Sequence, residues 1–456
     1  MNAPLTVAVV GSGPAGFYTA GALLNHDGQD VRVDLYERLA TPWGLVRAGV
    51  APDHPKIKSV SSVYTKIAAE ESFRFFGNVH VGGPDEGDIT REELAERYDA
   101  VVYTVGAQSD RKLGIPGEEL PGCVAALDFV GWYNGHPDFA DLSFDLSSRR
   151  AVVIGAGNVA LDVARILCSP VERLAKTDIA DHALVALADS SIEEVVVVGR
   201  RGPVQAAFTT PELKELPEYT ESGVLVHPED LPDADEDDAL PRAVKRNVAI
   251  MRDYAAGKTP LGKRHIALRF LRSPIELRGT GRVEEIMLGR NALKVAEDGW
   301  VAAVDTGERE SLDTGLVLRA VGYKGLPIAG LPYDQRKGVI PNTNGRVDGT
   351  EREYVAGWIK RGPTGIIGTN KKCAVETVTQ LLADLESGEL RRHDRDAFVD
   401  DVAAWLAERQ PHLVTQEGWR LIDAAERAAG EPHGRPRVKL VGREQLLGVA
   451  LGRAEV

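Results

Sequence analysis

Residues 5–16 read LTVAVVGSGPAG, a nearly continuous apolar run followed by a glycine turn of the form G-x-G-x-x-G. Such a short apolar run is typical of a parallel β-strand that is covered on both faces. In the turn, Gly11 permits the tight bend, Gly13 lets a pyrophosphate approach the backbone, and Gly16 lets the next helix pack closely. The N-terminus of that helix offers N–H groups to phosphate. The stretch therefore predicts a dinucleotide-binding βα unit.

The strand after this first turn ends in an acidic residue. Val31–Tyr36 is a second mostly apolar run, and Glu37 follows it, 21 residues after Gly16. An acid at this position accepts a hydrogen bond from a ribose hydroxyl. A glycine turn alone is a weak signal, but strand, turn, helix and acid in this order predict a dinucleotide site.

A second unit of the same kind begins at residue 151. Ala151–Ile154 is apolar and leads into GAGNVA, residues 155–160, the G-x-G-x-x-A form of the turn. The next apolar run, Val195–Val198, continues into Gly-Arg-Arg, residues 199–201, with no acid. Guanidinium groups bind phosphate bidentately, so the arginines predict binding of the 2′-phosphate of NADP(H). The alternative is two ordinary surface arginines in a loop.

The two units begin about 144 residues apart, which predicts an α/β protein with two Rossmann-like domains. Two dinucleotide sites in one chain favour a bound flavin and a visiting nicotinamide cofactor. The chain after Leu381 is mostly amphipathic helix and predicts a helical C-terminal tail, with Trp405 and Trp419 as packing anchors. The acidic stretch Pro228–Pro241 predicts a solvated loop.

The composition excludes several classes of protein. The 456 residues carry a formal net charge of −14, which argues against a nucleic-acid partner. The three cysteines include no Cys-x-x-Cys pair, so a cysteine-ligated metal or iron–sulfur site and a redox-active dithiol are not expected. We predict no metal site.

The sequence also predicts a location. No apolar run approaches the roughly 18 residues that a membrane helix needs, so membrane insertion is not expected. The start lacks a basic segment and leads directly into the first predicted strand. It therefore does not resemble a signal peptide, and we expect a cytoplasmic protein.

Taken together, the motifs resemble the adrenodoxin-reductase-like NADPH–ferredoxin reductases, and the bacterial members in particular. The resemblance spans nearly the whole chain in order. It rests on VVGSGPAG (9–16), TPWGLVRAGVAPDHPK (41–56), FRFFGNV (73–79), YTVGA (103–107), IGAGNVALDVAR (154–165), VGRRGP (198–203) and GWIKRGPTGIIGTNK (357–371).

The resemblance implies a discontinuous FAD-binding domain, residues 1–107 and 322–456, with an NADP-binding domain, residues 108–321, inserted in it. The FAD contacts that it implies are Gly11, Gly13, Ala15, Gly16, Glu37, Leu45, Val81, Trp358, Gly365, Ile366 and Ile367. The NADP(H) contacts that it implies are Arg111, Gly157, Asn158, Val159, Ala160, Arg200, Arg201, Glu212 and Gly365.

Two further residues match family positions near the contact of flavin and nicotinamide. The resemblance gives His54 and Glu212 catalytic roles, in which they orient the nicotinamide and tune flavin protonation. The structural alternatives are that His54 satisfies a buried loop and that Glu212 starts a helix behind Pro211.

The implied activity is transfer of a hydride from NADPH to FAD, followed by transfer of single electrons to a ferredoxin-type iron–sulfur partner. Hydride transfer needs no side-chain nucleophile, so positioning and electrostatics are expected to dominate catalysis. The alternatives are a flavin-dependent monooxygenase or amine oxidase, and an electron-transfer subunit on the same scaffold. A disulfide reductase is excluded by the missing cysteine pair.

The charges are unevenly distributed along the chain. Residues 212–240 contain eleven acids and one lysine, whereas residues 242–278 contain ten Lys or Arg and two acids. Arg242, Lys245 and Arg246 have helical spacing and share a face. Ferredoxins are characteristically acidic, so we predict that this face docks one. The alternative is two solvated faces that neutralise each other.

Overall fold

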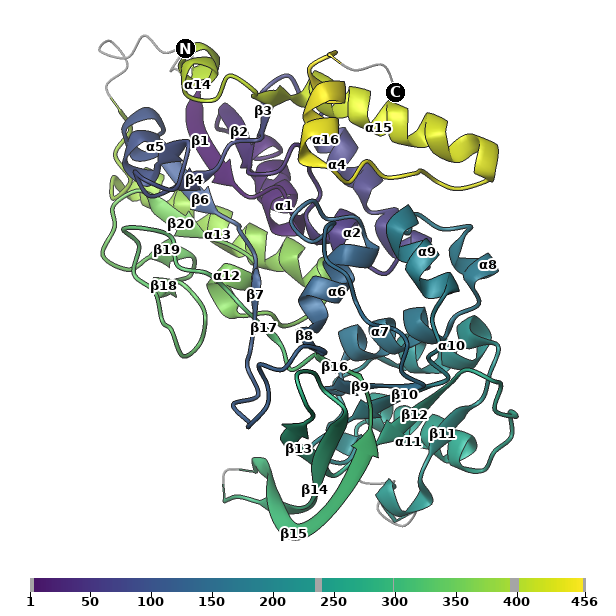
Figure 1. Ribbon diagram of the computed structural model, residues 1–456. Coiled ribbons are helices and arrows are strands. Elements are labelled where there is room, and N and C mark those ends of the chain that lie inside the picture. The colour runs from purple at the N-terminus through teal and green to yellow at the C-terminus, as the bar shows by residue number, and fades with distance from the viewer. Residues whose placement is uncertain (1–3, 234–239, 298, 394–401, 454–456) are drawn as a thin grey trace. The chain divides into compact units, whose positions relative to one another are not determined.

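The computed structural model describes residues 4–233, 240–297, 299–393 and 402–453, which divide into two compact units (Figure 1). Unit 1 comprises Met1–Val50, His54–Ser109 and Tyr323–Val456. Unit 2 comprises Ala51–Asp53 and Asp110–Gly322. The predicted boundaries at 107/108 and 321/322 lie within two residues of these crossings. The inclusion of Ala51–Asp53 in unit 2 was not predicted, and the cofactor assigned to each unit stays a prediction.

Unit 1 is built on an eight-stranded sheet with the order β18-β19-β20-β6-β1-β2-β3-β21. The five strands from β20 to β3 run parallel to one another, whereas β19 and β21 pair antiparallel with β20 and β3. The strands are β1 Leu5–Val10, β2 Val31–Glu37, β3 Phe73–Gly77, β6 Ala100–Tyr103, β18 Asn342–Thr343, β19 Arg346–Val347, β20 Glu353–Val355 and β21 Val414–Thr415. Two short pairs are β4 Val81–Gly82 with β5 Ile89–Thr90 and β7 Ser109–Asp110 with β17 Tyr323–Lys324.

β1, the central strand of this sheet, is buried on both faces, as its apolar sequence predicted. Val7 and Val9 belong to one core cluster, whereas Ala8 and Val10 belong to another. Side chains alternate between the faces of a strand, so one short run fills two layers of core. Trp419 of the C-terminal tail is buried in the first cluster, and Trp405 packs against the second.

The helices of unit 1 cover the two faces of the sheet, and α1 packs against α13. They are α1 Pro14–Leu24, α2 Leu45–Ala48, α3 Pro55–Lys58, α4 Ser61–Ile67, α5 Arg91–Arg97, α12 Trp358–Arg361, α13 Ile367–Ser387, α14 Val402–Arg409, α15 Gln416–Gly430 and α16 Arg443–Ala450. The last three form the helical tail, shown in yellow-green to yellow in Figure 1.

Unit 2 contains a six-stranded sheet, all parallel, with the order β11-β12-β10-β9-β16-β8. Its strands are β8 Cys123–Ala125, β9 Arg150–Ile154, β10 Glu194–Val198, β11 Val224–Val226, β12 His265–Arg269 and β16 Leu316–Arg319. A separate antiparallel sheet consists of β13 Arg272–Arg278, β14 Glu285–Val295 and β15 Val301–Asp313. The predicted fold class, α/β with two Rossmann-like units, is confirmed.

The helices of unit 2 are α6 Ala126–Tyr133, α7 Asn158–Cys168, α8 Val171–Leu174, α9 Asp181–Ala188, α10 Thr210–Thr220 and α11 Arg242–Ala255. The acidic stretch 228–241 starts with a short 3-10 turn, Pro228–Asp230. Its residues 234–239 lie outside the described residues. In the described part of the chain, no helix is long and apolar enough to cross a bilayer.

Candidate cofactor sites

In the glycine turn that follows β1, the first and third glycines are tightly packed, whereas the second faces open space. Gly11 has φ +105°, and a Cβ placed on it would lie 2.8 Å from the carbonyl oxygen of Thr104. A Cβ on Gly16 would lie 2.0 Å from the carbonyl oxygen of Gly11. No described atom lies within 4 Å of a Cβ built on Gly13. The first and third glycines are thus required by packing, while the second faces space that fits a pyrophosphate.

The segments of the predicted FAD site come together at this turn. The N–H of Trp43 donates to the carbonyl oxygen of Ser12 at 3.0 Å. Gly44, with φ +50°, lies so close that its Cβ would be 2.8 Å from Cα of Gly13. A Cβ on Gly357 would be 2.6 Å from Cβ of Ala15. Stretches that are more than 300 residues apart in sequence therefore surround one turn.

Glu37 is fixed at the end of β2 beside the turn. Its Oε2 accepts hydrogen bonds from the backbone N–H of Ser12 at 3.1 Å and from the Ser12 hydroxyl at 2.6 Å. Its Oε1 accepts from the N–H of Leu39 at 3.0 Å. The carboxylate is half-buried, so it remains partly accessible. This is the place where an acid binds a ribose hydroxyl in such units.

The late glycine-rich block lies between β20 and α13. Gly357, Gly362 and Gly365 all have φ near +80° (+79°, +84° and +79°), a conformation that favours glycine. The indole Nε1 of Trp358 is buried and has no hydrogen-bond partner among the described residues. A buried donor of this kind points to a missing acceptor. Together with the space at the first turn, it shows that unit 1 fits FAD.

The remaining predicted FAD contacts lie in unit 1 at several levels of burial. Leu45 is the first residue of α2 and is half-buried. Val81 forms half of β4 and packs against the cluster that contains Val10. Ile366 is 64% exposed immediately before α13, and Ile367 packs partly against the core.

The second glycine turn, after β9, repeats the geometry of the first. Gly155 has φ +137°, and its Cβ would lie 2.3 Å from the carbonyl oxygen of Ala320. A Cβ on Gly157 would meet no described atom within 4 Å, whereas Ala160 is fully buried. Val159 is half-buried in the first turn of α7. The turn is therefore open at the position that a pyrophosphate needs.

Asn158 connects this turn to the start of α10. Its Oδ1 accepts a hydrogen bond from the N–H of Thr209, the N-cap residue of α10, at 2.8 Å. Arg111 lies elsewhere in unit 2, is exposed, and donates its backbone N–H to the carbonyl oxygen of Gly322 at 3.2 Å.

The backbone at the predicted 2′-phosphate site is held at three points. The carbonyl oxygens of residues 199–201 accept hydrogen bonds from the N–H of Arg272, the side-chain amide of Asn291 and the N–H of Leu271, at 3.1, 2.8 and 3.1 Å. Asn291 is buried within β14. Its contact with Arg200 was not predicted from the sequence, where the signal is a polar amide in a strand, a place where Asn is uncommon.

The two predicted arginines have no carboxylate partner among the described residues. Arg200 is exposed and Arg201 is half-buried. The guanidinium carbon of Arg201 lies 5.1 Å from the centroid of the Trp300 ring. Arginines in proteins are commonly neutralised by acids, so two that are not so paired in unit 2 fit an anionic ligand such as a phosphate.

A buried ionic cluster in unit 2 surrounds Arg165. The fully buried guanidinium donates to both carboxylate oxygens of Asp53, at 2.6 and 2.9 Å, and to Asp162 at 2.8 Å. Its third contact is Glu212, at 3.5 Å. One positive charge thus faces three carboxyl groups. Asp53 and Arg165 were missed as functional candidates, although both lie inside the stretches that carry the resemblance.

Glu212 is the third residue of α10 and is buried. Burial raises its pKa, the negative charge of Asp162 raises it further, and Arg165 lowers it, with a result of about 7. Glu212 therefore holds a proton up to about neutral pH. His54, in unit 1, is buried at the N-terminus of α3.

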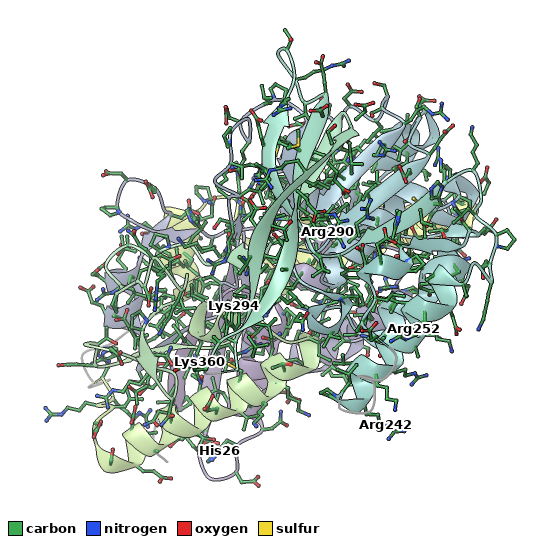
Figure 2. All side chains as sticks on the ribbon, turned by 90° about the horizontal axis from the view of Figure 1, so that it is seen from below. His26, Arg242, Arg252, Arg290, Lys294 and Lys360 are labelled. Atoms are coloured by element: carbon green, nitrogen blue, oxygen red, sulfur yellow. The ribbon has the colours of Figure 1, made fainter. Side chains whose placement is uncertain are left out.

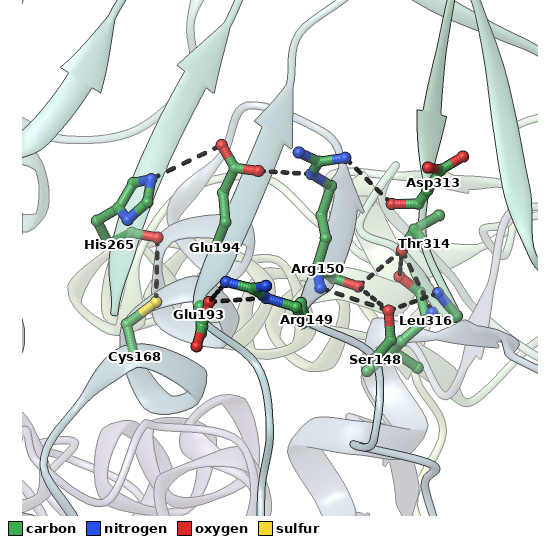
Figure 3. A network of polar contacts seen from close by, with 11 residues as sticks. Ser148, Arg149, Arg150, Cys168, Glu193, Glu194, His265, Asp313, Thr314 and Leu316 are labelled. Carbon is green, nitrogen blue, oxygen red and sulfur yellow. Dashed lines mark hydrogen bonds and ion pairs between the residues drawn. The ribbon is translucent and has the colours of Figure 1, made fainter. Parts of the chain in front are cut away.

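At the opposite edge of the unit 2 sheet, acidic and basic side chains form ion pairs with one another (Figure 3). At the amino ends of β9 and β10, Arg150 forms an ion pair with Glu194, and Arg149 forms one with Glu193. His265, at the start of β12, lies 3.7 Å from Glu194. Arg200 and Arg201 follow the carboxyl end of β10, the edge where ligands bind in open parallel sheets.

Comparisons with known proteins agree in both sequence and structure. Residues 5–237 match the family described as pyridine nucleotide-disulphide oxidoreductase. The chain is 55% identical to NADPH-ferredoxin reductase FprA of Mycobacterium tuberculosis, covering 98% of this chain and 100% of FprA. It is 44% identical to the mitochondrial NADPH:adrenodoxin oxidoreductase of Arabidopsis thaliana, covering 98% and 95% of the two chains. The structure of Mycobacterium tuberculosis FprA in complex with NADPH superimposes with a TM-score of 0.94 over 99% and 100% of the chains.

Proposed function

The chain belongs to the NADPH-ferredoxin reductases of the pyridine nucleotide-disulphide oxidoreductase family, and from this we propose that it is a flavoprotein that carries electrons from NADPH to a ferredoxin-type partner. The observation that carries the proposal is the contrast between its two glycine turns. Both are open at the middle glycine, but the first is followed by a strand ending in Glu37. The second is followed by a strand leading into two arginines that have no carboxylate partner among the described residues. One site is therefore suited to FAD and the other to NADP(H).

FAD, when bound, supplies a centre that accepts a hydride from NADPH and returns the two electrons singly. In our proposal the residues of unit 1 bind and orient it. Gly13 lets the pyrophosphate reach the N-terminus of α1, and Glu37 binds the ribose. The far end of FAD is contacted by Trp358, Gly365, Ile366 and Ile367. The N–H groups at the start of α13 stabilise negative charge there. Leu45 and Val81 complete the walls of the proposed FAD site.

The residues of unit 2 bind the nicotinamide cofactor in this proposal. Gly157, Asn158, Val159 and Ala160 form the pyrophosphate turn at the N-terminus of α7. Arg200 and Arg201 bind the 2′-phosphate, and Arg111 makes a further contact. Gly365 belongs to unit 1, and its contact with the nicotinamide cofactor stays a prediction from the resemblance. This arrangement selects NADPH over NADH because only NADPH offers the extra phosphate.

His54 and Glu212 are proposed to act on the reacting rings. Glu212 can hold or release a proton near neutral pH, because its pKa is raised to about 7. Arg165 is a positioning residue for Glu212, since it fixes the buried carboxyl groups around it. The electrostatic environment, rather than a nucleophile, then aids hydride transfer.

The cysteines argue against disulfide chemistry despite the name of the family. Cys123, Cys168 and Cys373 are all free. Burial raises the pKa of the Cys168 thiol to about 12, so it does not form a thiolate at neutral pH. The same three cysteines cannot ligate an iron–sulfur cluster, which disfavours the electron-transfer subunit. No observation favours the monooxygenase or amine oxidase.

We propose an acidic ferredoxin as the partner and the first turns of α11 as its docking site. Arg242, Lys245 and Arg246 are exposed there, and Figure 2 labels Arg242 at one end of the helix and Arg252 further along it. The names of the relatives, ferredoxin and adrenodoxin reductases, support a ferredoxin-type partner. A cytoplasmic location stays a prediction from the sequence.

Anaerobic titration of the purified protein tests the proposed function. We expect a yellow protein whose visible flavin absorbance is bleached by NADPH, weakly or not by NADH, and restored by oxidised ferredoxin. A colourless protein that takes up no added FAD would contradict the flavoprotein assignment. Equal bleaching by NADH would contradict the role of the two arginines, and bleached flavin that reduces no ferredoxin would contradict the partner.

A further inference from the structure

We propose that Trp300 is a specificity-determining residue for NADP(H): its indole fixes the guanidinium of Arg201 so that the free edge of that group binds the 2′-phosphate. The inference rests on the proposed function, because it concerns the same phosphate. It goes further in assigning the discrimination between NADPH and NADH partly to an aromatic residue outside the glycine turns and outside the arginine pair.

Trp300 is not explained by core packing. Its side chain is 55% exposed, although tryptophan is among the most buried residues on average. It directly precedes β15, and its ring lies against Arg201, with 5.1 Å between the guanidinium carbon and the ring centroid. An exposed tryptophan next to a cation that has no carboxylate partner in the described part of the chain indicates a ligand site better than a structural one.

The backbone places Trp300 at this point. β14 and β15 pair in register up to Val295 and Val301, and the N–H of Ala296 donates to the carbonyl oxygen of Trp300 at 2.8 Å. Leu293, on the same strand pair, lies 3.4 Å from a Cβ built on Gly202. The end of the hairpin therefore lies directly against the turn that carries Arg201.

The sheet of β13, β14 and β15 thus holds the turn of residues 199–201, the arginine turn, in two ways. Asn291 of β14 and the residues that begin β13 bind its carbonyl oxygens, and the end of the hairpin contacts the side chain of Arg201. In Figure 2 the labelled Arg290 and Lys294 mark β14, one of the two long strands of this sheet. Asn291 and Leu293 contact the turn that carries Arg201, so the end of the hairpin with Trp300 is anchored beside the predicted phosphate site.

The chemistry explains why an indole is useful here. A guanidinium group is planar, and an aromatic ring over one face leaves the N–H edge accessible. Arginine loses rotamer freedom when it binds phosphate, and a ring contact made before binding reduces that loss. Arg200 has no ring contact among the described residues. Arg201 therefore makes the oriented, bidentate contact with the 2′-phosphate, and Arg200 makes a more mobile charge contact with it.

The test uses the FAD-loaded protein and two probes that differ only in the 2′-phosphate, 2′,5′-ADP and 5′-AMP. A cation–π contact at an exposed site corresponds to a factor of about two to five in a binding constant. We expect Trp300→Ala to weaken binding of 2′,5′-ADP by that factor in calorimetry and to leave 5′-AMP unchanged. Trp300→Phe should retain most of the affinity, and Val304→Ala, an exposed apolar residue on the same hairpin, should retain all of it.

A double-mutant cycle isolates the coupling. In an Arg201→Ala background, Trp300→Ala should have no further effect on 2′,5′-ADP. An equal loss for both probes, or a full additional loss without Arg201, would overturn the proposal, as would unchanged affinity in Trp300→Ala. If the unmodified protein binds 2′,5′-ADP no better than 5′-AMP, the NADP(H) assignment itself fails, and this result does not depend on Trp300.

Discussion

At the scale of single residues, Glu212 fits the structural interpretation of its sequence position, and its catalytic role stays a proposal. It is a first-turn acid behind Pro211 in α10, as the helix-start interpretation predicts. It also belongs to the buried cluster around Arg165, which no helix start requires. A carboxyl group used only for capping does not need burial beside Asp162 and Asp53. The cluster around Arg165 therefore favours a functional reason for the raised pKa of Glu212.

This raised pKa gives the stability of the folded protein a pH dependence of known sign. In the unfolded chain Glu212 ionises near its ordinary value of 4.5, whereas in the folded chain it stays protonated up to about 7. Between these values the folded state holds the extra proton, so the contribution of Glu212 lowers the free energy of unfolding as pH rises. Glu212→Gln removes this titration. We expect the variant to gain stability relative to wild type across this window and to keep a constant difference above it.

Denaturant unfolding of the FAD-loaded protein between pH 4 and 8 checks this expectation. Glu218→Gln, which removes an exposed carboxylate from the same helix, is the matched control and should follow wild type. If the profile of Glu212→Gln also runs parallel to wild type, Glu212 is not the buried proton holder.

Residues with a local signal could be predicted, and residues that act across long sequence distances could not. The glycines of both turns and Glu37 lie at fixed spacings from a strand, so their positions follow from the motif. Asn291 and Trp300 reach the arginine turn from β14 and the hairpin end, about 90 residues later. Nothing in the local sequence states which turn a distant strand will contact.

At the scale of elements, α15 connects the C-terminal tail to the predicted flavin site. Glu426 on α15 is fully buried and binds both terminal nitrogens of Arg47, on α2, one of them at 2.8 Å. It also accepts from Arg437 and from the N–H of Leu440, both at 3.0 Å. Burial alone raises the pKa of Glu426, but the charge and hydrogen bonds of Arg47 and Arg437 outweigh it and lower the pKa. Because α2 begins at Leu45, the tail holds a predicted FAD contact in place.

Removing the charge of Glu426 should therefore loosen the flavin. Glu426→Gln leaves the buried guanidinium groups of Arg47 and Arg437 without their shared counter-charge, which costs about 3–5 kcal/mol in comparable buried pairs. We expect a lower unfolding midpoint and faster release of FAD, measured by the recovery of free flavin fluorescence on heating or dilution. Glu417→Gln, an exposed acid in the first turn of α15, is the control. Undiminished FAD retention in the Glu426 variant would show that the tail is independent of the site.

Elements covered on both faces could be predicted better than half-exposed ones. The predicted runs Leu5–Val10, Ala151–Ile154 and Val195–Val198 match β1, β9 and β10 to within one residue at each end. The long hairpin β14–β15 was not predicted, because Val301–Asp313 is rich in charged residues and mostly exposed. Its strands are stabilised by pairing with each other, which leaves little apolar signal in the sequence.

At the scale of the whole molecule, the structure shows that fewer cations of the basic region, residues 242–278, are available for docking than the sequence indicated. Several of its ten cations are already neutralised: Lys258 pairs with Asp253, Arg278 pairs with Glu276, and Arg269 and Arg272 pair with Asp230 and Glu310. Three further cations of the region, Arg242, Lys245 and Arg246, are exposed in the first turns of α11. Cations at the positive end of a helix dipole do not stabilise the helix, so their presence favours a role in binding.

Reversing these three charges tests whether they steer an acidic partner. We expect Arg242→Glu, Lys245→Glu and Arg246→Glu together to slow ferredoxin-dependent cytochrome c reduction at least about tenfold at low ionic strength and to flatten its salt dependence. Reduction of ferricyanide by NADPH, which needs no docking, should be retained. Reversing Arg149, Arg420 and Arg427, three exposed arginines on other surfaces, changes the net charge equally and should have little effect. Equal slowing by both triple variants would mean that net charge matters and α11 does not, and equal loss of ferricyanide reduction would mean that the reversal damages the enzyme itself.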